Sequence, residues 1–567
     1  MADVQEPLLL LPSPRHIERR GDVSTAAVSE TIDPAVARPQ GYQLSITPQA
    51  CRITGHDAAG VFYARQTLAQ LRRCFGRALP CLEIEDWPDF PARGVMLDIS
   101  RDKVPTMATL FSLIDRLAEW KVNQLQLYIE HTFAYAGHEA VWRDASPMLP
   151  GEIQSLDEYC RARFIELAPN QNSFGHMERW LRHPKYLPLA EAPDGADTPW
   201  GFRWDGPFSL CPIDEKSLDL LGDLYTQLLP NFSSGLFNVG CDETFDIGQG
   251  RSGDICAERG VHEVYLEFLS RVDALVRRHG RRMMFWGDVI LHQPELIPRL
   301  PRQAIALNWG YEANHPFDAE AERFAKSGAP FYVCPGTSSW CSIAGRTDNM
   351  LANQRSAAEA GLKHGAIGYL NTDWGDYGHL QYLPISYAGL AAGAAMSWCY
   401  ESNRELPLAD LLDAHVFEDR AKIIGSAACA LGNVYQAIGK PMNNRSALFG
   451  IFVPSSTHRD PMEGITTEGL DASLAVIDSA TRDLQRAKMK RPDAKLIISE
   501  FENAATMLRF ACEIGKMKLD GPSVNQKRLA KNLRKIVKEH RRCWMARNRA
   551  GGLEDSIRKL AENAGSV

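Results

Sequence analysis

The feature that most constrains the fold of this chain is a repeated alternation of short apolar runs with helical patterns, beginning near residue 94. Short apolar runs are typical of buried parallel strands, and longer segments with apolar residues every three or four positions are typical of helices. Eight candidate strands lie at residues 95–99, 124–129, 164–168, 236–239, 283–286, 304–308, 331–334 and 367–370. Helical patterns lie at residues 107–121, 261–279, 318–326, 350–364 and 385–395. The alternation predicts an α/β fold with a (β/α)8 TIM barrel.

A doubly wound sheet is the alternative architecture. It is disfavoured because no Gly-rich phosphate-binding turn follows an early strand. Three domains are predicted: a small N-terminal α/β domain at 1–88, the catalytic barrel at 89–400 and a C-terminal helical domain at 401–567. In the first of these, strands are expected at 8–11 and 42–46 and a helix at 58–73, and prolines at 88 and 91 mark its end.

Two further stretches stand out by composition. Residues 177–229 are long and polar, with several tryptophans and prolines, and they are expected to supply loops over the barrel mouth. The segment 524–549 is dense in Lys and Arg, and we interpret it as a solvated helix face in preference to a nucleic-acid surface. No pattern explains residues 544–553, where Arg-Asn-Arg-Ala-Gly-Gly lies late in the helical part.

The overall composition narrows the class of protein. Of the 567 residues 45% are hydrophobic and 23% are charged, which is typical of a globular protein with a large core. The net charge of −7 is too small to indicate a polyanionic partner, so nucleic acid is not expected. The 13 cysteines show no C-x-x-C pair, which favours reduced thiols in the cytoplasm. The apolar run at 7–12 is a poor secretory signal and no run approaches the ~20 residues of a membrane helix, so no membrane partner is expected.

The fourth candidate strand ends in two adjacent carboxylates, Asp242 and Glu243. In a barrel, the carboxyl ends of the strands form the catalytic face. Two neighbouring carboxylates repel, so a site of low dielectric keeps one protonated, as a general acid requires. The alternative is that the pair merely caps the next helix, and the pair alone does not decide between them.

Other strand ends also carry polar and aromatic residues. Arg101 and Asp376 are candidates for hydrogen bonds to sugar hydroxyls, with a buried ion pair as the alternative. Four tryptophans at one rim are better explained by an aromatic-walled pocket than by core filling, and such walls suit a sugar ring. These tryptophans are Trp286, Trp309, Trp340 and Trp374.

A metal site is the main competing hypothesis for the same strand ends. The ligand types of an amidohydrolase-like barrel are present at Glu130, His131, His176, Asp242 and Asp373. No H-x-H pair follows the first strand, however, and no other compact ligand pair stands out. No metal and no cofactor are therefore expected.

These motifs resemble glycoside hydrolase family 20, the β-N-acetylhexosaminidases, and most closely a bacterial subgroup of exo-β-N-acetylglucosaminidases with a helical C-terminal domain. The motifs are RGVMLDISR at 93–101, FGH at 174–176, VGCDE at 239–243 and DWGD at 373–376. The sequences YQLSI at 42–46 and GVFYARQTL at 60–68 resemble the small domain that precedes the family's barrel. The resemblance covers roughly residues 8 to 400.

The resemblance implies roles for individual residues. Glu243 is implied as the general acid/base, and Asp242 as the residue that positions the substrate's 2-acetamido group, whose carbonyl oxygen attacks the anomeric carbon to give an oxazolinium intermediate with retention. The implied substrate-binding residues are Arg101, Glu130, His176, Trp286, Trp309, Trp340, Trp374 and Asp376.

Three positions depart from the family pattern. Cys241 stands where glycine is usual, and Asp376 stands where many members have glutamate, which shortens the reach toward a distal hydroxyl. The tyrosine that binds the acetamido oxygen has no clear match, and Tyr311, Tyr332 and Trp340 remain candidates.

The sequence thus predicts a cytoplasmic exo-β-N-acetylhexosaminidase, with a carbohydrate substrate that ends in β-linked GlcNAc or GalNAc, and a homodimer is expected. A catalytically inactive sugar-binding barrel and a metal-dependent barrel hydrolase are the alternatives.

Overall fold

The computed structural model describes residues 8–36, 38–101, 103–521 and 526–563. Its centre is a sheet of eight parallel strands in the order β11-β12-β13-β14-β15-β6-β7-β8. The strands are β6 (Ala92–Asp98), β7 (Gln124–Tyr128), β8 (Glu166–Ala168), β11 (Leu236–Asn238), β12 (Arg282–Trp286), β13 (Ile305–Trp309), β14 (Phe331–Cys334) and β15 (Gly368–Asp373). The sheet closes just beyond β8, where the Gln171 amide donates to the Asn238 carbonyl oxygen at 2.9 Å. The predicted (β/α)8 barrel is confirmed.

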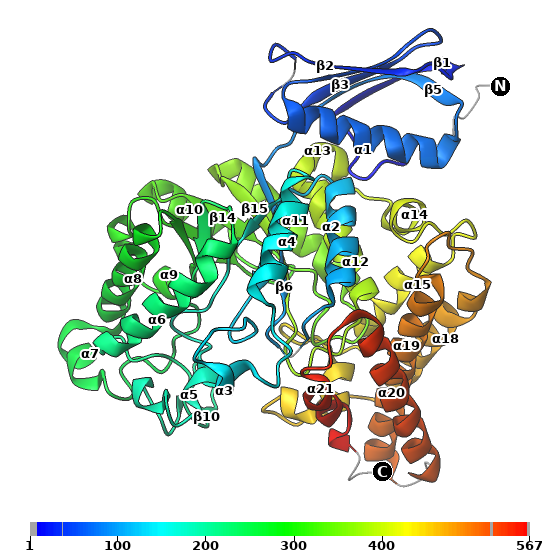
Figure 1. Cartoon of the computed structure of the whole chain (residues 1–567). Coiled ribbons are helices and arrows are strands. Elements are labelled where there is room, and N and C mark those ends of the chain that lie inside the picture. Colours follow the sequence, from blue (N-terminus) through cyan, green and yellow to red (C-terminus); the bar gives the residue numbers. More distant parts are fainter. Residues whose placement is uncertain (1–7, 37, 102, 522–525, 564–567) are drawn as a thin grey trace.

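Helices surround the barrel (Figure 1). Their apolar faces pack on the strands, as the helical spacing predicts. The longer ones are α2 (Met107–Glu119), α4 (Pro150–Arg161), α6 (Glu215–Leu228), α8 (Val261–Arg278), α10 (Phe317–Ser327), α11 (Thr347–His364) and α12 (Leu383–Trp398). The shorter ones are α3 (Glu139–Trp142), α5 (Glu178–Leu181), α7 (Gly253–Arg259) and α9 (Asp288–Leu291). The loops expected between 177 and 229 contain α6 and a two-stranded hairpin, β9 (Ala196–Asp197) with β10 (Arg203–Trp204).

The N-terminal part is a five-stranded sheet with one long helix, α1 (Ala58–Phe75). Its strand order is β1-β5-β3-β4-β2. The strands are β1 (His16–Ser24), β2 (Val28–Ile32), β3 (Tyr42–Ile46), β4 (Cys51–Gly55) and β5 (Leu79–Asp86). The strand predicted at 8–11 is wrong: the backbone N–H and carbonyl of Leu11 pair with the side chain of Gln70 on α1, at 2.8 and 2.6 Å, instead of with a strand.

The N-terminal part packs at the end of the barrel where the strands begin (Figure 1). Arg93, at the start of β6, donates to the Gln40 side-chain oxygen at 3.0 Å and to the Tyr63 hydroxyl at 3.2 Å. Residues at the carboxyl ends of the strands therefore face away from this contact.

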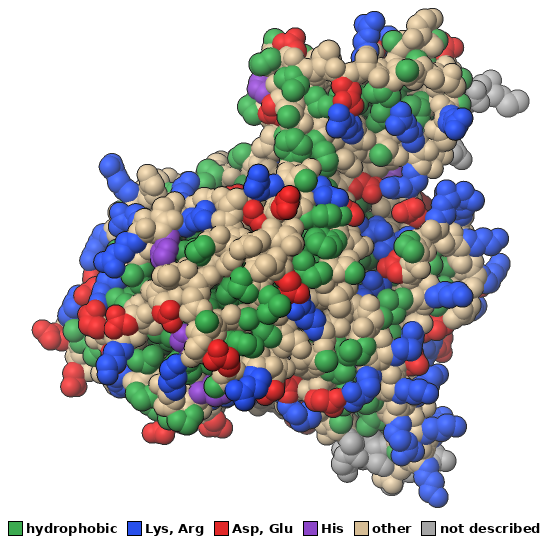
Figure 2. All heavy atoms as spheres, viewed as in Figure 1, with side chains coloured by type: hydrophobic (Ala, Val, Ile, Leu, Met, Phe, Trp, Pro, Cys, Tyr) green, Lys and Arg blue, Asp and Glu red, His purple; other side chains and the backbone are tan. Residues whose placement is uncertain are grey.

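The C-terminal part is helical within the described residues and packs beside the barrel (Figure 1). Its helices are α13 (Tyr400–Asn403), α14 (Leu408–Leu411), α15 (Ile424–Leu431), α16 (Val434–Ala437), α17 (Ala447–Phe452), α18 (Thr467–Thr481), α19 (Ala494–Asp520), α20 (Gln526–Arg547) and α21 (Leu553–Leu560). Helix α20 buries Leu529, Leu533 and Ile536, and its Lys and Arg side chains other than Arg547 are exposed. Figure 2 shows Lys and Arg gathered over these helices, as expected for a solvated face.

The boundaries predicted at 88 and 400 agree with these parts in broad outline but stay predictions. None of the helices in the described part of the chain has the length and apolar character needed to cross a bilayer.

Candidate active site

A cavity of about 580 Å³ opens at the carboxyl ends of the barrel strands. Nine of the ten predicted site residues line it: Arg101, Glu130, His176, Asp242, Glu243, Trp286, Trp309, Trp374 and Asp376. They come from loops after different strands, so the barrel brings together residues that are distant in the sequence.

A strained turn after β11 carries the two adjacent carboxylates. Gly240, Cys241 and Glu243 have positive φ angles of 69°, 68° and 51°. A Cβ atom on Gly240 would lie 1.6 Å from the Asn172 side-chain oxygen, so glycine is required there. The Cys241 side chain is buried, does not line the cavity, and bears a Cβ where φ favours glycine.

His176 lies between the two carboxylates. Its Nε2 atom is 3.3 Å from Asp242 Oδ2 and 3.4 Å from Glu243 Oε2. Burial opposes a charge on this imidazole, but the neighbouring carboxylates outweigh it and raise the pKa of His176 well above its ordinary value. His176 therefore supplies a positive charge that offsets the repulsion within the Asp242–Glu243 pair. The other oxygen of the Asp242 carboxylate, Oδ1, is buried without a hydrogen-bond partner.

Asp288, a third carboxylate, lies behind this pair and was not among the predicted site residues. Its Oδ2 atom accepts the Glu243 backbone N–H at 3.0 Å, and its Oδ1 atom accepts the Trp309 indole N–H at 3.3 Å. Burial and the Asp242 charge raise the pKa of Asp288 to about 8. Asp288 thus fixes the backbone of Glu243 to the cavity wall. The sequence signal was its place at the end of the fifth strand.

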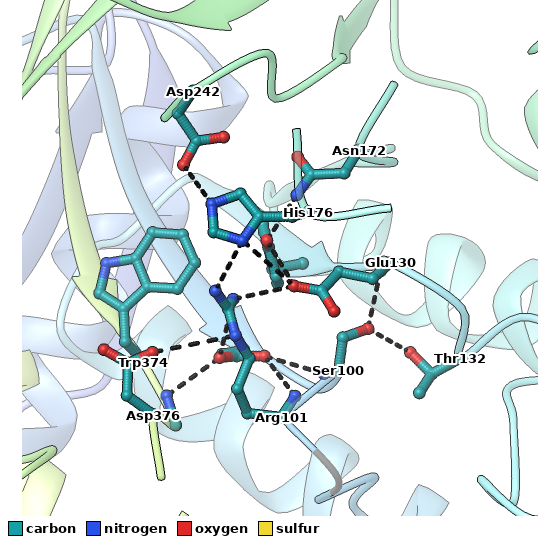
Figure 3. A network of polar contacts seen from close by, with 12 residues as sticks. Ser100, Arg101, Glu130, Thr132, Asn172, His176, Asp242, Trp374 and Asp376 are labelled. Carbon is teal, nitrogen blue, oxygen red and sulfur yellow. Dashed lines mark hydrogen bonds and ion pairs between the residues drawn. The ribbon is translucent and has the colours of Figure 1, made fainter. Parts of the chain in front are cut away.

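Arg101 lies at the centre of a network of polar contacts in the cavity (Figure 3). Its Nη1 atom is 3.4 Å from both Asp98 Oδ2 and Glu130 Oε1, and its Nε atom is 3.8 Å from Asp376 Oδ1. The guanidinium also stacks over the Trp374 ring, 5.1 Å from its centroid. The Arg101–Asp376 pair is thus an ion pair, and both members face the cavity; hydrogen bonds from the two residues to sugar hydroxyls stay a prediction.

The surroundings of Glu130 disfavour the charged form of its carboxyl group. It accepts the Tyr128 hydroxyl at 2.9 Å, and burial raises its pKa to about 7, although Arg101 opposes this shift. At neutral pH its carboxyl group is therefore poised between its charged and neutral forms.

The aromatic wall differs from the prediction at one position. Trp286, Trp309 and Trp374 line the cavity, but Trp340 does not. Trp340 is buried behind Tyr311, with the two rings edge to face at 4.9 Å, and its indole N–H donates to Asn444. Tyr311 thus lies on the cavity wall against Trp340, and the predicted contact of Trp340 with substrate stays a prediction without support from this geometry.

Among the three candidates for the acetamido contact, only Tyr311 lines the cavity. Its hydroxyl accepts the Trp374 indole N–H at 2.7 Å. Tyr332 lies inside the barrel, where its ring stands against Gly368.

Further residues of the cavity wall were not predicted individually, although residues 177–229 were expected to supply loops over the barrel mouth. Trp200, Phe202 and Trp204 come from the β9–β10 hairpin, and Arg445 and Lys559 come from the C-terminal part. The several tryptophans between 177 and 229 were a visible signal for the hairpin, but the C-terminal residues carry no motif.

Of the five candidate ligands of a metal site, Glu130, His176 and Asp242 line the cavity, but His131 and Asp373 do not. The Asp373 carboxylate accepts hydroxyl hydrogen bonds from Thr337, Ser339 and Ser386 at 2.6–2.9 Å and does not line the cavity. Among the described residues, no three His, Cys, Asp or Glu side chains are arranged to hold a metal ion.

Comparison with known proteins gives two matches to sequence models of one family. Residues 10–87 match glycosyl hydrolase family 20, domain 2, and residues 147–359 match the glycosyl hydrolase family 20 catalytic domain. Together these ranges span just over half of the chain.

Curated relatives are similar over part of their length. A β-hexosaminidase of Akkermansia muciniphila is 23% identical over 330 residues, which are 53% of this chain and 66% of the relative. A β-hexosaminidase of Porphyromonas gingivalis is 22% identical over 307 residues, 48% of this chain and 39% of the relative. The match thus spans less than two thirds of either relative.

Solved structures share the fold. A crystal structure of a β-N-acetylhexosaminidase aligns with a TM-score of 0.60 at 19% identity, over 72% of this chain and 95% of that one. The chitobiase of Flavobacterium johnsoniae aligns with a TM-score of 0.57 at 15% identity, over 97% of this chain and 99% of that one. With both family domains matched and the barrel aligned, the chain belongs to glycoside hydrolase family 20.

Proposed function

We propose that this protein is a retaining exo-β-N-acetylhexosaminidase that removes terminal β-linked GlcNAc or GalNAc through an oxazolinium intermediate. The observation that carries the proposal is the arrangement of Asp242 and Glu243, side by side in one cavity and bridged by His176. Similarity to proteins named β-hexosaminidase supports the same activity.

Glu243 is the proton donor in this proposal. Its side chain is 30% exposed, against 8% for Asp242, so it is the member of the pair that reaches the leaving-group side of the cavity. It protonates the glycosidic oxygen as the bond to the anomeric carbon breaks, and its carboxylate then takes a proton from the water that opens the intermediate.

The nucleophile is the acetamido oxygen of the substrate. It is tethered to the sugar, so its attack on the anomeric carbon avoids much of the entropic cost of a separate nucleophile. The unpartnered Oδ1 of Asp242 accepts the acetamido N–H, and the Asp242 charge stabilises the positive charge that develops on this nitrogen. Tyr311 is the residue we assign to the acetamido oxygen, because its hydroxyl already lies on the cavity wall.

The terminal sugar lies against Trp286, Trp309 and Trp374, and Arg101 and Asp376 bind its ring hydroxyls. Hydrogen bonds from a charged guanidinium to hydroxyls contribute more than neutral ones, so Arg101 accounts for much of the sugar affinity. The shorter side chain of Asp376, relative to the glutamate of many members, bears on the choice between the gluco and galacto epimers.

The decisive experiment is hydrolysis of aryl N-acetylglucosaminides whose acetyl methyl is progressively fluorinated. Each fluorine makes the carbonyl oxygen a poorer nucleophile, so the rate should fall steeply along the series, and β-glucosides without the acetamido group should be inert. A flat series, or a glycosyl ester trapped on a protein carboxylate, would exclude the substrate-assisted route.

Two alternatives are separated by simple assays. A sugar-binding barrel without catalysis would release no p-nitrophenol from p-nitrophenyl N-acetyl-β-glucosaminide, whereas the proposed enzyme releases it. A metal-dependent hydrolase would lose activity in EDTA, and the proposed enzyme would keep it.

The cellular location and the assembly are also proposals. None of the 13 cysteines forms a disulfide, which supports a reducing compartment such as the cytoplasm. The homodimer expected from the sequence stays a prediction, which size-exclusion chromatography with light scattering would test.

A further inference from the structure

The segment 544–553, which no sequence pattern explained, pairs with the loop that follows Arg101. The Thr106 amide donates to the Arg547 carbonyl at 2.9 Å, and the Arg549 amide donates to the Val104 carbonyl at 2.8 Å. These bonds form a short backbone bridge between the C-terminal part and the end of the first barrel loop. The run Arg-Asn-Arg therefore has a structural partner close to the sugar-binding guanidinium.

The Ala-Gly-Gly that follows is fitted to another loop at the barrel mouth. A Cβ atom on Gly551 would lie 2.3 Å from the carbonyl carbon of Ala145, so only glycine allows this approach. The Gly551 amide donates to Ser146 Oγ at 2.9 Å, and Arg549 donates to the Pro147 carbonyl at 2.7 Å. The unexplained segment is thus built to lie against the catalytic end of the barrel.

The loop that carries Asp376 is strained and contacts the same C-terminal region. Tyr377, Gly378 and His379 follow Asp376 with φ angles of 55°, 91° and 50°. Consecutive residues in the left-handed region persist only where the surroundings hold them. A Cβ atom on Gly378 would lie 2.9 Å from Lys559 Cγ, so helix α21 packs directly on this loop.

A chain of hydrogen bonds joins the helices to the loop. Ser556 Oγ is 2.5 Å from the Gly378 carbonyl oxygen, and His540 Nε2 is 3.0 Å from Ser556 Oγ. On the other side of the imidazole, Tyr382 OH is 3.0 Å from His540 Nδ1, and Asn503 Nδ2 donates to Tyr382 OH at 2.8 Å. The residues come from α19, α20, α21 and the start of α12, so this series of hydrogen bonds crosses the interface between the C-terminal helices and the barrel.

The direction of donation along this series of hydrogen bonds follows from the groups at its two ends. The Gly378 carbonyl only accepts, so Ser556 donates to it and accepts from the His540 Nε2–H. His540 Nδ1 is then an acceptor, Tyr382 donates to it, and Tyr382 in turn accepts from Asn503. All four side chains are buried, and burial lowers the pKa of His540 to about 3, which keeps the neutral imidazole that this direction requires. A buried network satisfied from end to end is rigid.

We propose that the C-terminal region 540–559 is a positioning element of the sugar pocket, which holds the loop 376–379 through Ser556 and His540 so that Asp376 meets a distal sugar hydroxyl. The proposal rests on the hydrolase activity proposed above. It gives the helical part a role in substrate recognition, and Ser556 and His540 act through Asp376 without touching the substrate.

The test compares Ser556→Ala with Ser473→Ala. Ser473 is an equally buried serine of the same helical part, whose hydroxyl donates to the Gly469 carbonyl at 2.8 Å within α18 instead of to the loop. The readout is the ratio of kcat/KM for p-nitrophenyl N-acetyl-β-glucosaminide to that for its 4-deoxy and 6-deoxy analogues, which measures recognition of the distal hydroxyls.

Ser556→Ala should lower this ratio for one analogue by roughly 3- to 10-fold, the size of a weakened hydrogen bond to a charged group. Ser473→Ala should leave the ratio unchanged. Ser556→Thr, which keeps the hydroxyl, should restore it. Tyr382→Phe breaks the chain two links earlier without changing volume, and should shift the ratio in the same direction by a smaller factor.

The proposal is overturned if Ser556→Ala and Tyr382→Phe lower the thermal unfolding temperature but keep the wild-type ratio, because the region would then be structural only. If Ser556→Ala does not fold, Tyr382→Phe decides alone. A wild-type protein inert on every N-acetylhexosaminide would refute the hydrolase activity instead. Calorimetric binding of N-acetylglucosamine and its deoxy analogues would then provide the same comparison.

Discussion

Replacing Arg101 by lysine is the most informative single perturbation of the sugar pocket. The substitution keeps the positive charge but removes the planar fork of the guanidinium. In the structure this fork serves Asp98 and Glu130 at 3.4 Å each and Asp376 at 3.8 Å. A single ammonium cannot occupy all three positions, so at least one carboxylate loses its cation.

The expected fall in kcat/KM can be calculated from these contacts. All three guanidinium nitrogens of Arg101 have contacts: Nη1 with Asp98 and Glu130, Nε with Asp376, and Nη2 with His176. A hydrogen bond to a charged group contributes about 1.5–3 kcal/mol, and a lysine that keeps one such bond but loses a second should lower kcat/KM by roughly 10- to 100-fold. Where the lysine ammonium no longer lies within 3.4 Å of Glu130, its charge opposes the raised pKa of Glu130 less, so Glu130 should stay protonated to higher pH.

The assay is steady-state hydrolysis of p-nitrophenyl N-acetyl-β-glucosaminide, with circular dichroism and thermal unfolding as checks of the fold. Arg93→Lys is the matched control, because Arg93 is a buried arginine in β6, the strand that Arg101 follows, at the end away from the cavity. It should lose stability but keep the KM of the wild-type protein. A folded Arg101→Lys variant with near wild-type kinetics would place the sugar pocket elsewhere.

Three further predictions concern the turn after β11. Glu243→Gln should lower turnover of unactivated glycosides by ~10²–10⁴-fold, but should lower turnover of aryl glycosides with acidic leaving groups much less. Equal decreases in the two assays would show that Glu243 is not the general acid. Gly240→Ala should abolish activity and destabilise the fold in urea titrations, because its Cβ would overlap Asn172; a wild-type urea midpoint would contradict this. Asp288→Asn should change the pH dependence of the free energy of unfolding. Because its pKa is raised, Asp288 in the folded protein binds a proton between about pH 4 and about pH 8 that it does not bind in the unfolded chain. The free energy of unfolding of the wild-type protein therefore falls as pH rises across that window. The variant should lack this part of the slope, and an unchanged slope in urea midpoints would show that Asp288 is not protonated.

The barrel was predictable because its strands are buried on both sides. All eight runs are short, apolar and bounded by polar residues, and each coincides with an observed strand within a few residues. The N-terminal edge strand β1 was missed because its sequence, HIERRGDVS, is almost wholly exposed and shows no apolar alternation. The apolar run at 8–11 does not form a strand because an apolar pattern alone does not distinguish a strand from a segment whose backbone bonds to a side chain.

The site was predictable where the position of a residue just after a strand makes its side chain face the cavity, as for Asp242, Glu243 and Arg101. It was not predictable where two residues compete for one place on the wall. Tyr311 follows β13 by two residues, whereas Trp340 lies six residues beyond β14, and only their packing at 4.9 Å decides which one faces the cavity. Lys559 and Ser556 depend on how a remote helix docks, which no local pattern encodes.

The charges of the cavity explain why neutral sugar substrates and this mechanism suit each other. Asp242, Glu243 and Asp376 face the cavity, and Arg101 and His176 are the cations closest to them. In the mechanism proposed above Glu243 enters the reaction with its proton, and Arg101 and His176 offset part of the charge of the other carboxylates, so a neutral N-acetylhexosamine is accommodated. In the proposed reaction Glu243 gives up its proton, so the site gains a negative charge at the moment when the substrate would become a positively charged oxazolinium. The site is then complementary to the intermediate and to the transition state that leads to it, and less so to the bound sugar, which is the condition for an electrostatic arrangement to accelerate the reaction.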